Sequence, residues 1–137
     1  MIEKSTIEKV LAVFFENPSK LDFHLRELSR ITKLSMPTII STTDKLAKEH
    51  LIIKFKGMVM TIVQAYRDNE KFTRYKLLHN LKKIYESEII EFLSEKYHHP
   101  KAIILFGSFS RGEDIERSDI DIAILIKKKI KFRSIAI

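Results

Sequence analysis

The sequence contains no cysteine and no apolar run of about 18 residues. The first absence excludes disulfides and thiolate metal sites, and it is compatible with a cytoplasmic protein. The second excludes a membrane-spanning helix. Acidic and basic residues precede the first apolar stretch, which is unlike a signal peptide. We therefore expect a cytoplasmic protein without a membrane partner.

The residues that are present form a basic chain of ordinary apolar content. Its 137 residues suffice for one ordinary domain or two small ones. Lysine and arginine number 25 against 18 acidic residues, which gives a net charge of +7. Such a charge suits a polyanionic partner, either a nucleic acid or an acidic protein.

The segment from Ala102 to Ile126 contains two apolar runs joined by a polar connection. The first run ends at Gly107-Ser108, and the second follows Asp119-Ile120-Asp121. Short isoleucine-rich runs bounded by turn residues predict buried strands. Because side chains alternate along a strand, the two aspartates share one face. Neighbouring carboxylates repel each other unless a cation lies between them, and a divalent metal with oxygen ligands is the natural candidate.

The spacing of these residues resembles a known signature. Gly107-Ser108, then ten residues, then Asp119-Ile120-Asp121 is similar to the motif of the DNA polymerase β-like nucleotidyltransferases, in their minimal form. Arg111-Gly112-Glu113 and Ser118 also fit this motif. The alternative is a surface strand pair that carries the same residues by chance.

The resemblance implies a role for each residue of the motif. Gly107 and Ser108 would hold the phosphates of an NTP, with ATP as the expected nucleotide. Arg111 would be a charge partner of the triphosphate, unless it is only a surface residue of the loop. Asp119 and Asp121 would be catalytic and would hold two Mg²⁺ ions, about 3.5–4 Å apart.

The first 68 residues show the pattern of three helices followed by a hairpin. The expected elements are a helix from Ser5 or Thr6 to Asn17, a helix over 23–32, a helix that Ser35 caps, and strands over 51–55 and 58–66. This order resembles a winged helix-turn-helix domain. The sequence departs from that family at His50, where a glycine often ends the recognition helix.

The winged-helix resemblance implies binding to DNA. Polar and basic side chains of the third helix would approach the major groove, and two lysines of the wing would contact phosphate. These residues are Ser35, Thr38, Ser41, Thr42 and Lys45 on the helix, with Lys54 and Lys56 on the wing. The alternative is a three-helix interaction module with a solvated polar face.

A linker helix is expected over residues 69–86. Apolar residues recur at helical spacing on one of its sides, at Phe72, Tyr75, Leu78, Leu81 and Tyr85. The helix is also basic, so it either packs as a linker or faces nucleic acid. A further helix through residues 89–97 is expected to cover one face of the following sheet. The charged residues between 113 and 117 are expected in a solvated loop.

The nucleotidyltransferase family uses a third carboxylate on a later strand. After Ile126 the chain continues with a basic tail, residues 127–137, that contains no acid. We expect this tail to be disordered, to form a weak strand, or to contact nucleic acid. Since two strands alone make a poor sheet, we expect the sequence to represent a C-terminally truncated transferase domain.

The expected architecture is therefore α+β. A winged helix of three helices plus a β-hairpin covers residues 1–68, a linker helix covers 69–86, and part of a polymerase β-like α/β domain covers 87–137. The expected function is transfer of a nucleoside monophosphate from an NTP to a hydroxyl acceptor, such as a side chain of a toxin partner. The alternative is a DNA-binding transcriptional regulator whose inactive transferase domain senses nucleotide or forms a homodimer. A further alternative is a remnant that folds only in part.

Overall fold

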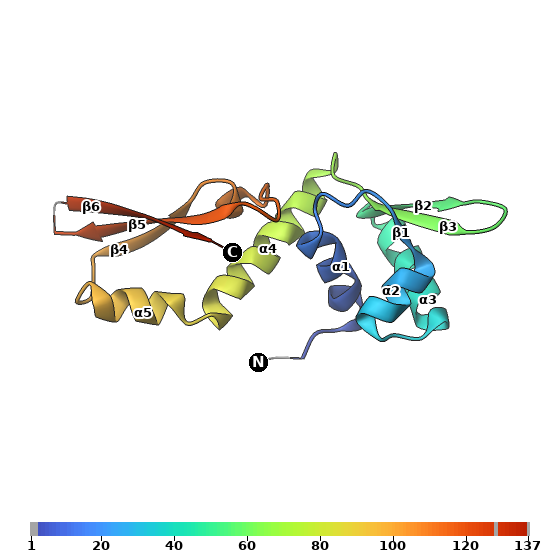
Figure 1. Ribbon diagram of the computed structural model, residues 1–137, viewed down its shortest axis with the longest axis horizontal. Coiled ribbons are helices and arrows are strands. Elements are labelled where there is room, and N and C mark those ends of the chain that lie inside the picture. The colour runs from blue at the N-terminus through green and yellow to red at the C-terminus, as the bar shows by residue number, and fades with distance from the viewer. Residues whose placement is uncertain (1–2, 128, 137) are drawn as a thin grey trace. The chain divides into compact units, whose positions relative to one another are not determined.

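The computed structural model describes residues 3–127 and 129–136 (Figure 1). The chain divides after Phe72 into two compact units, and helix α4 spans the division. The first elements are α1 (Thr6–Glu16), β1 (Phe23–His24), α2 (Leu25–Thr32), α3 (Met36–Lys48), β2 (Ile52–Lys56) and β3 (Thr61–Ala65). The later elements are α4 (Glu70–Glu86), α5 (Ile89–Lys96), β4 (Ala102–Phe106), the 3-10 turn η1 (Phe109–Arg111), β5 (Asp119–Ile126) and β6 (Lys129–Ala136). The described residues are therefore α+β, as predicted. None of their helices combines the length and the apolar character needed to cross a membrane.

The first unit has the predicted order of three helices and a hairpin. Helix α1 begins with a capping box, in which the Glu8 amide donates to Ser5 Oγ and the Ser5 amide donates to Glu8 Oε2. The predicted start of the second helix at Phe23 is wrong. Phe23 and His24 instead form β1, because Phe23 pairs with Val63 of β3 and its ring packs edge-on against Phe14 in the core. The sheet order is β1-β3-β2.

The second unit is built on the sheet β4-β5-β6, in which both neighbouring pairs are antiparallel. Helix α5 covers one face of this sheet, where Leu93 and Tyr97 form a core with Ile122 and Ile124 of β5 (Figure 1). The alternation of β5 places Asp119 and Asp121 on the opposite face. This cover by α5 is the one predicted from the apolar pattern of residues 89–97.

The basic tail is a full strand in the described residues. Residues 129–136 pair with β5 along its whole length, from Ile126↔Lys129 to Asp119↔Ala136. Of the two predicted structural alternatives, the strand is therefore confirmed and disorder is wrong for this segment, while residues 128 and 137 lie outside the described residues. A third strand also removes the objection that two strands alone make a poor sheet.

The buried side of α4 differs from the prediction. Tyr75, Leu78 and Tyr85 are exposed, although the apolar pattern placed them on the packed side. Lys76 and Asn80 are buried instead, with 4% and 2% of their surfaces exposed. Helical spacing alone could not show this, because the partners of these two polar side chains come from a loop more than 25 residues later in the chain.

Candidate active site

The turn after β4 brings backbone against a carboxylate. Gly107 has φ +78°, a conformation that favours glycine. A β-carbon at this position would overlap Oδ2 of Asp121 and lie 3.1 Å from its Cγ. The glycine is therefore required by its backbone conformation and by the close approach of Asp121. The structure thus brings together the two halves of the predicted motif, which are separated by ten residues in the sequence.

Asp121 lies between two neighbouring strands on the open face of the sheet. Its partner on β4 is Phe106, and its partner on β6 is Ser134. The Ser134 hydroxyl donates to Asp121 Oδ1 over 2.5 Å. Asp119, two residues earlier on the same face, is exposed. One carboxylate thus accepts a hydrogen bond from a serine and lies close to a glycine, while the other is exposed to solvent.

The loop after Gly107 is held by its own backbone. The Ser108 carbonyl accepts from the amides of Arg111 (3.1 Å) and Glu113 (3.0 Å). Ser110 donates its hydroxyl to the Gly107 carbonyl over 2.6 Å. The Arg111 guanidinium donates to Glu113 over 2.9 Å, and both side chains are more than half exposed. Arg111 therefore forms an exposed ion pair with Glu113, and exchanging Glu113 for a phosphate would cost little free energy.

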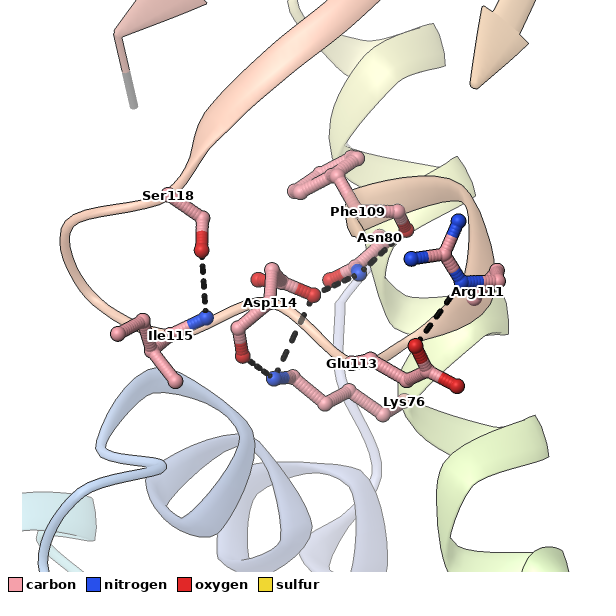
Figure 2. Close-up of polar contacts among 8 residues, drawn as sticks. All are labelled: Lys76, Asn80, Phe109, Arg111, Glu113, Asp114, Ile115 and Ser118. Carbon is pink, nitrogen blue, oxygen red and sulfur yellow. Dashed lines mark hydrogen bonds and ion pairs between the residues drawn. The ribbon is translucent and has the colours of Figure 1, made fainter. Parts of the chain in front are cut away.

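A buried polar cluster joins this loop to α4 (Figure 2). The Asn80 amide donates to Asp114 Oδ1 over 2.7 Å and to the Phe109 carbonyl over 3.0 Å. The Lys76 ammonium donates to the Asp114 carbonyl and lies 3.4 Å from its carboxylate Oδ1. Asp114 is only 8% exposed, so the prediction that it belongs to a solvated loop is wrong. The cluster compensates the burial of two charged groups by pairing them.

The second glycine of the motif also packs against α4. Gly112 is buried with φ +69°, and a β-carbon there would lie 2.5 Å from the Thr73 carbonyl oxygen and 3.0 Å from the Leu77 amide nitrogen. The loop and helix backbones are therefore in direct contact at this point. Together with Lys76 and Asn80, this contact fixes the position of the loop that carries Ser108 and Arg111.

The donor set fits a divalent cation only in part. The described residues contain no group of three or more His, Cys, Asp or Glu side chains placed to hold a metal. Asp119 and Asp121 remain a pair of oxygen donors on one face. Mg²⁺ is commonly bound by one or two carboxylates together with substrate phosphates and water, so the pair suits one Mg²⁺ shared with a nucleotide. Among the described residues, no further carboxylate lies beside this pair as a ligand for the predicted second ion.

The predicted DNA-binding residues fall into two groups. Ser41, Lys45, Lys56 and Ser35 are exposed, and Thr38 is half-buried with its hydroxyl 2.9 Å from that of Ser35. The remaining two are buried. Thr42 is 4% exposed, and the side chain of Lys54 is 7% exposed.

Lys54 is engaged inside the first unit. Its ammonium donates to Asp44 Oδ1 over 2.7 Å, and this hydrogen bond holds the pKa of the Asp44 carboxyl below its ordinary value. In the same way, hydrogen bonds from Lys71 and Lys20 lower the pKa values of Glu49 and Glu27. The exposed residues of α3 and Lys56 at the end of β2 are therefore the part of the predicted set that can reach a ligand.

Several residues of the site carried no signal in the sequence. Lys76 and Asn80 occupy a helix in which the apolar pattern marked other residues for packing, and Ser134 lies in a tail without an acid. A polar pair spaced four residues apart on one helix is the only sequence feature that could have pointed to Lys76 and Asn80.

Comparison with known proteins supports the motif. Residues 87–136 match the family described as Polymerase beta, Nucleotidyltransferase. No curated protein and no solved structure gives a significant match to the chain. The matched stretch contains α5, the sheet and the loop, and it ends with the last residue of β6, Ala136. The resemblance carried by Gly107-Ser108 and Asp119-Ile120-Asp121 is therefore supported, for residues 87–136, as that of a polymerase β-type nucleotidyltransferase.

Proposed function

We propose that this protein transfers a nucleoside monophosphate from an NTP, with ATP as the expected donor, to a hydroxyl group. The observation that carries the proposal is the approach of Gly107 backbone to the Asp121 carboxylate, within a stretch that matches the nucleotidyltransferase family. In the reaction, the acceptor oxygen forms a bond to the α-phosphorus, the bond from the α-phosphorus to the bridging oxygen breaks, and pyrophosphate leaves. The proton of the hydroxyl passes to solvent.

The residues of the chain have separate tasks in this proposal. The amide and hydroxyl of Ser108 donate to phosphate oxygens, and the absence of a side chain at Gly107 leaves room for the Asp121 carboxylate beside this turn. Arg111 exchanges its exposed partner Glu113 for the triphosphate. Asp119 and Asp121 would hold Mg²⁺, which when bound neutralises charge on the phosphates. The cluster of Lys76, Asn80 and Asp114 keeps the loop in place.

Label transfer tests this proposal. The purified chain is incubated with α-labelled ATP, Mg²⁺ and candidate protein acceptors, and the label on protein is measured. We expect Asp119→Asn and Asp121→Asn to abolish transfer, while Glu91→Gln, an exposed acid on α5, leaves it unchanged. Transfer that is equal in the parent and in both aspartate variants would contradict the proposal.

We further propose that the first unit binds DNA. The proposed contacts are Ser35, Thr38, Ser41 and Lys45 on α3 and Lys56 on the wing. Thr42 and Lys54 are left out, because both are buried and Lys54 pairs with Asp44. A mobility-shift assay tests this part: Lys45→Ala and Lys56→Ala should weaken binding and reduce its salt dependence. Lys9→Ala on α1 is the control, and binding that is lost equally in all three variants would contradict the proposed interface.

A second candidate function is nucleotide-regulated DNA binding without transfer. It is favoured by one observation: the residue beside Asp121 on β6 is Ser134, and no third acid completes the site among the described residues. In that case MgATP binds and alters DNA affinity, but label transfer is absent. Measuring DNA affinity with and without MgATP separates the two candidates.

A further inference from the structure

The open face of the second sheet carries aromatic side chains beside the acid pair. In the row of Asp121, the neighbours are Phe106 on β4 and Ser134 on β6. In the next row, Ala123 lies between Ile104 and Phe132. Two contacts confirm that these residues share a face. Ser134 reaches Asp121 over 2.5 Å, and the rings of Phe106 and Phe132 lie edge-to-face with centroids 5.8 Å apart.

This aromatic pair is not covered by the described residues. Helix α5 packs on the other face of the sheet. Phe132 is 64% exposed, Phe106 is 36% exposed and Ile104 is 47% exposed. Ala123, which lies between Ile104 and Phe132 in the sheet, is by contrast buried. A contiguous exposed apolar patch next to polar groups is typical of a binding site.

We propose that Phe106 and Phe132 form the platform for the base of the nucleotide, an inference that rests on the proposed nucleotidyl transfer. Phe106 is directly opposite Asp121, at about 4.5–5.5 Å between β-carbons, and Phe132 is on the diagonal at about 7–8 Å. A nucleotide whose phosphates lie at Ser108 and the aspartates places its base one ribose further along the same face. Phe106 and Phe132 are the aromatic residues of that row and the next.

The chemistry of the platform predicts how it treats different bases. Phenylalanine, isoleucine and alanine side chains offer no hydrogen-bond donor or acceptor, so the platform contacts the π-face of the base and does not read its edge. Stacking of this kind tolerates any base, and purines gain more because their area is larger. We therefore expect ATP and GTP to bind with similar affinity and CTP and UTP to bind more weakly.

The experiment compares a ligand with a base to a ligand without one. Isothermal titration of the full chain with ATP and with inorganic tripolyphosphate, both in Mg²⁺, gives the two dissociation constants. The variants are Phe132→Ala, Phe132→Trp and Ile130→Ala. Ile130 is the matched control, because it is exposed on the same face of the same strand, two residues from Phe132. Hydrogen exchange of β5 verifies that each variant retains the sheet.

The expected result is specific to the base. Phe132→Ala should weaken ATP binding by about 5- to 100-fold and leave tripolyphosphate binding unchanged. Phe132→Trp should retain ATP affinity, and Ile130→Ala should resemble the parent. An equal loss for both ligands, or no loss for ATP, overturns the platform.

The remaining outcomes separate this inference from the proposed function. If the parent chain binds ATP no better than tripolyphosphate, the platform is wrong while the phosphate site stands. If neither ligand binds, both proposals fail. If Phe132→Ala leaves ATP binding intact but converts a dimer to a monomer in analytical ultracentrifugation, the face belongs to a second copy of the chain and the platform is overturned.

Discussion

Replacing Lys76 by methionine should lower the free energy of unfolding of the second unit by more than a substitution of an exposed residue does. The side chain of Lys76 is 5% exposed and that of Asp114 is 10% exposed. At 3.4 Å and an effective dielectric constant of about 20, their attraction is about 5 kcal/mol before desolvation. Removing one partner leaves a buried charge, at a cost of about 3–5 kcal/mol. We expect the lower end, about 3 kcal/mol, because Asn80 still donates to the Asp114 carboxylate.

Native-state hydrogen exchange measures this loss in each unit separately. A loss of about 3 kcal/mol lowers the protection of amides in β5 by roughly 100-fold, while core amides of α2 and α3 serve as the internal reference. Lys101→Met, an exposed lysine of the same unit, is the control and should change protection by less than about threefold. The double variant Lys76→Met/Asp114→Asn removes both charges and should recover most of the loss.

Two results would refute this reasoning. Protection in Lys76→Met equal to that in Lys101→Met would mean that the ion pair adds nothing to the stability of the unit. A double variant as unstable as the sum of its single changes would mean that the two residues are not coupled.

The remaining predictions concern the site and the first unit. Gly107→Ala should abolish NTP binding, as measured by titration. Alanine at φ +78° costs about 1–2 kcal/mol, and its β-carbon would displace the Asp121 carboxylate. Retained NTP binding would contradict the close approach of Gly107 and Asp121. Ser134→Asp should raise Mg²⁺ affinity and label transfer by adding a carboxylate beside Asp121, whereas Ser134→Ala should not; equal transfer in both variants would show that this position does not limit the site. The pKa of the Asp44 carboxyl is lowered in the folded state from its ordinary value of 3.8. The ion pair with Lys54 therefore stabilises the first unit fully at pH values above 3.8, and this contribution is lost as the pH falls through the lowered pKa. Urea unfolding should therefore show that Asp44→Asn is less stable than the parent at neutral pH and that the two converge in acid, while a difference independent of pH would exclude the ion pair as its cause.

The local pattern of the sequence was sufficient for most elements of this protein. Apolar runs ending at Gly107-Ser108 and beginning after Asp121 predicted β4 and β5, because burial and turn chemistry act on adjacent residues. Alternation along β5 placed both aspartates on one face. The helices of the first unit followed from helical spacing, and α1 also from its cap at Ser5. Ser35 precedes α3 as predicted, but its side chain makes no capping hydrogen bond and its hydroxyl lies 2.9 Å from that of Thr38. The two residues of β1 depend on pairing with β3.

Contacts between distant segments decided the rest. Lys76 and Asn80 are buried because the loop with Asp114, more than 30 residues later in the chain, packs against α4, where both side chains donate to Asp114. The basic tail is a strand because β5 offers it an edge, and that pairing alone puts Ser134 beside Asp121 and Phe132 against Phe106. The sequence by itself thus predicted which residues would bind phosphate and metal. The tertiary structure decided what surrounds them, because the hydrogen bonds and ring contacts join segments that share no local pattern.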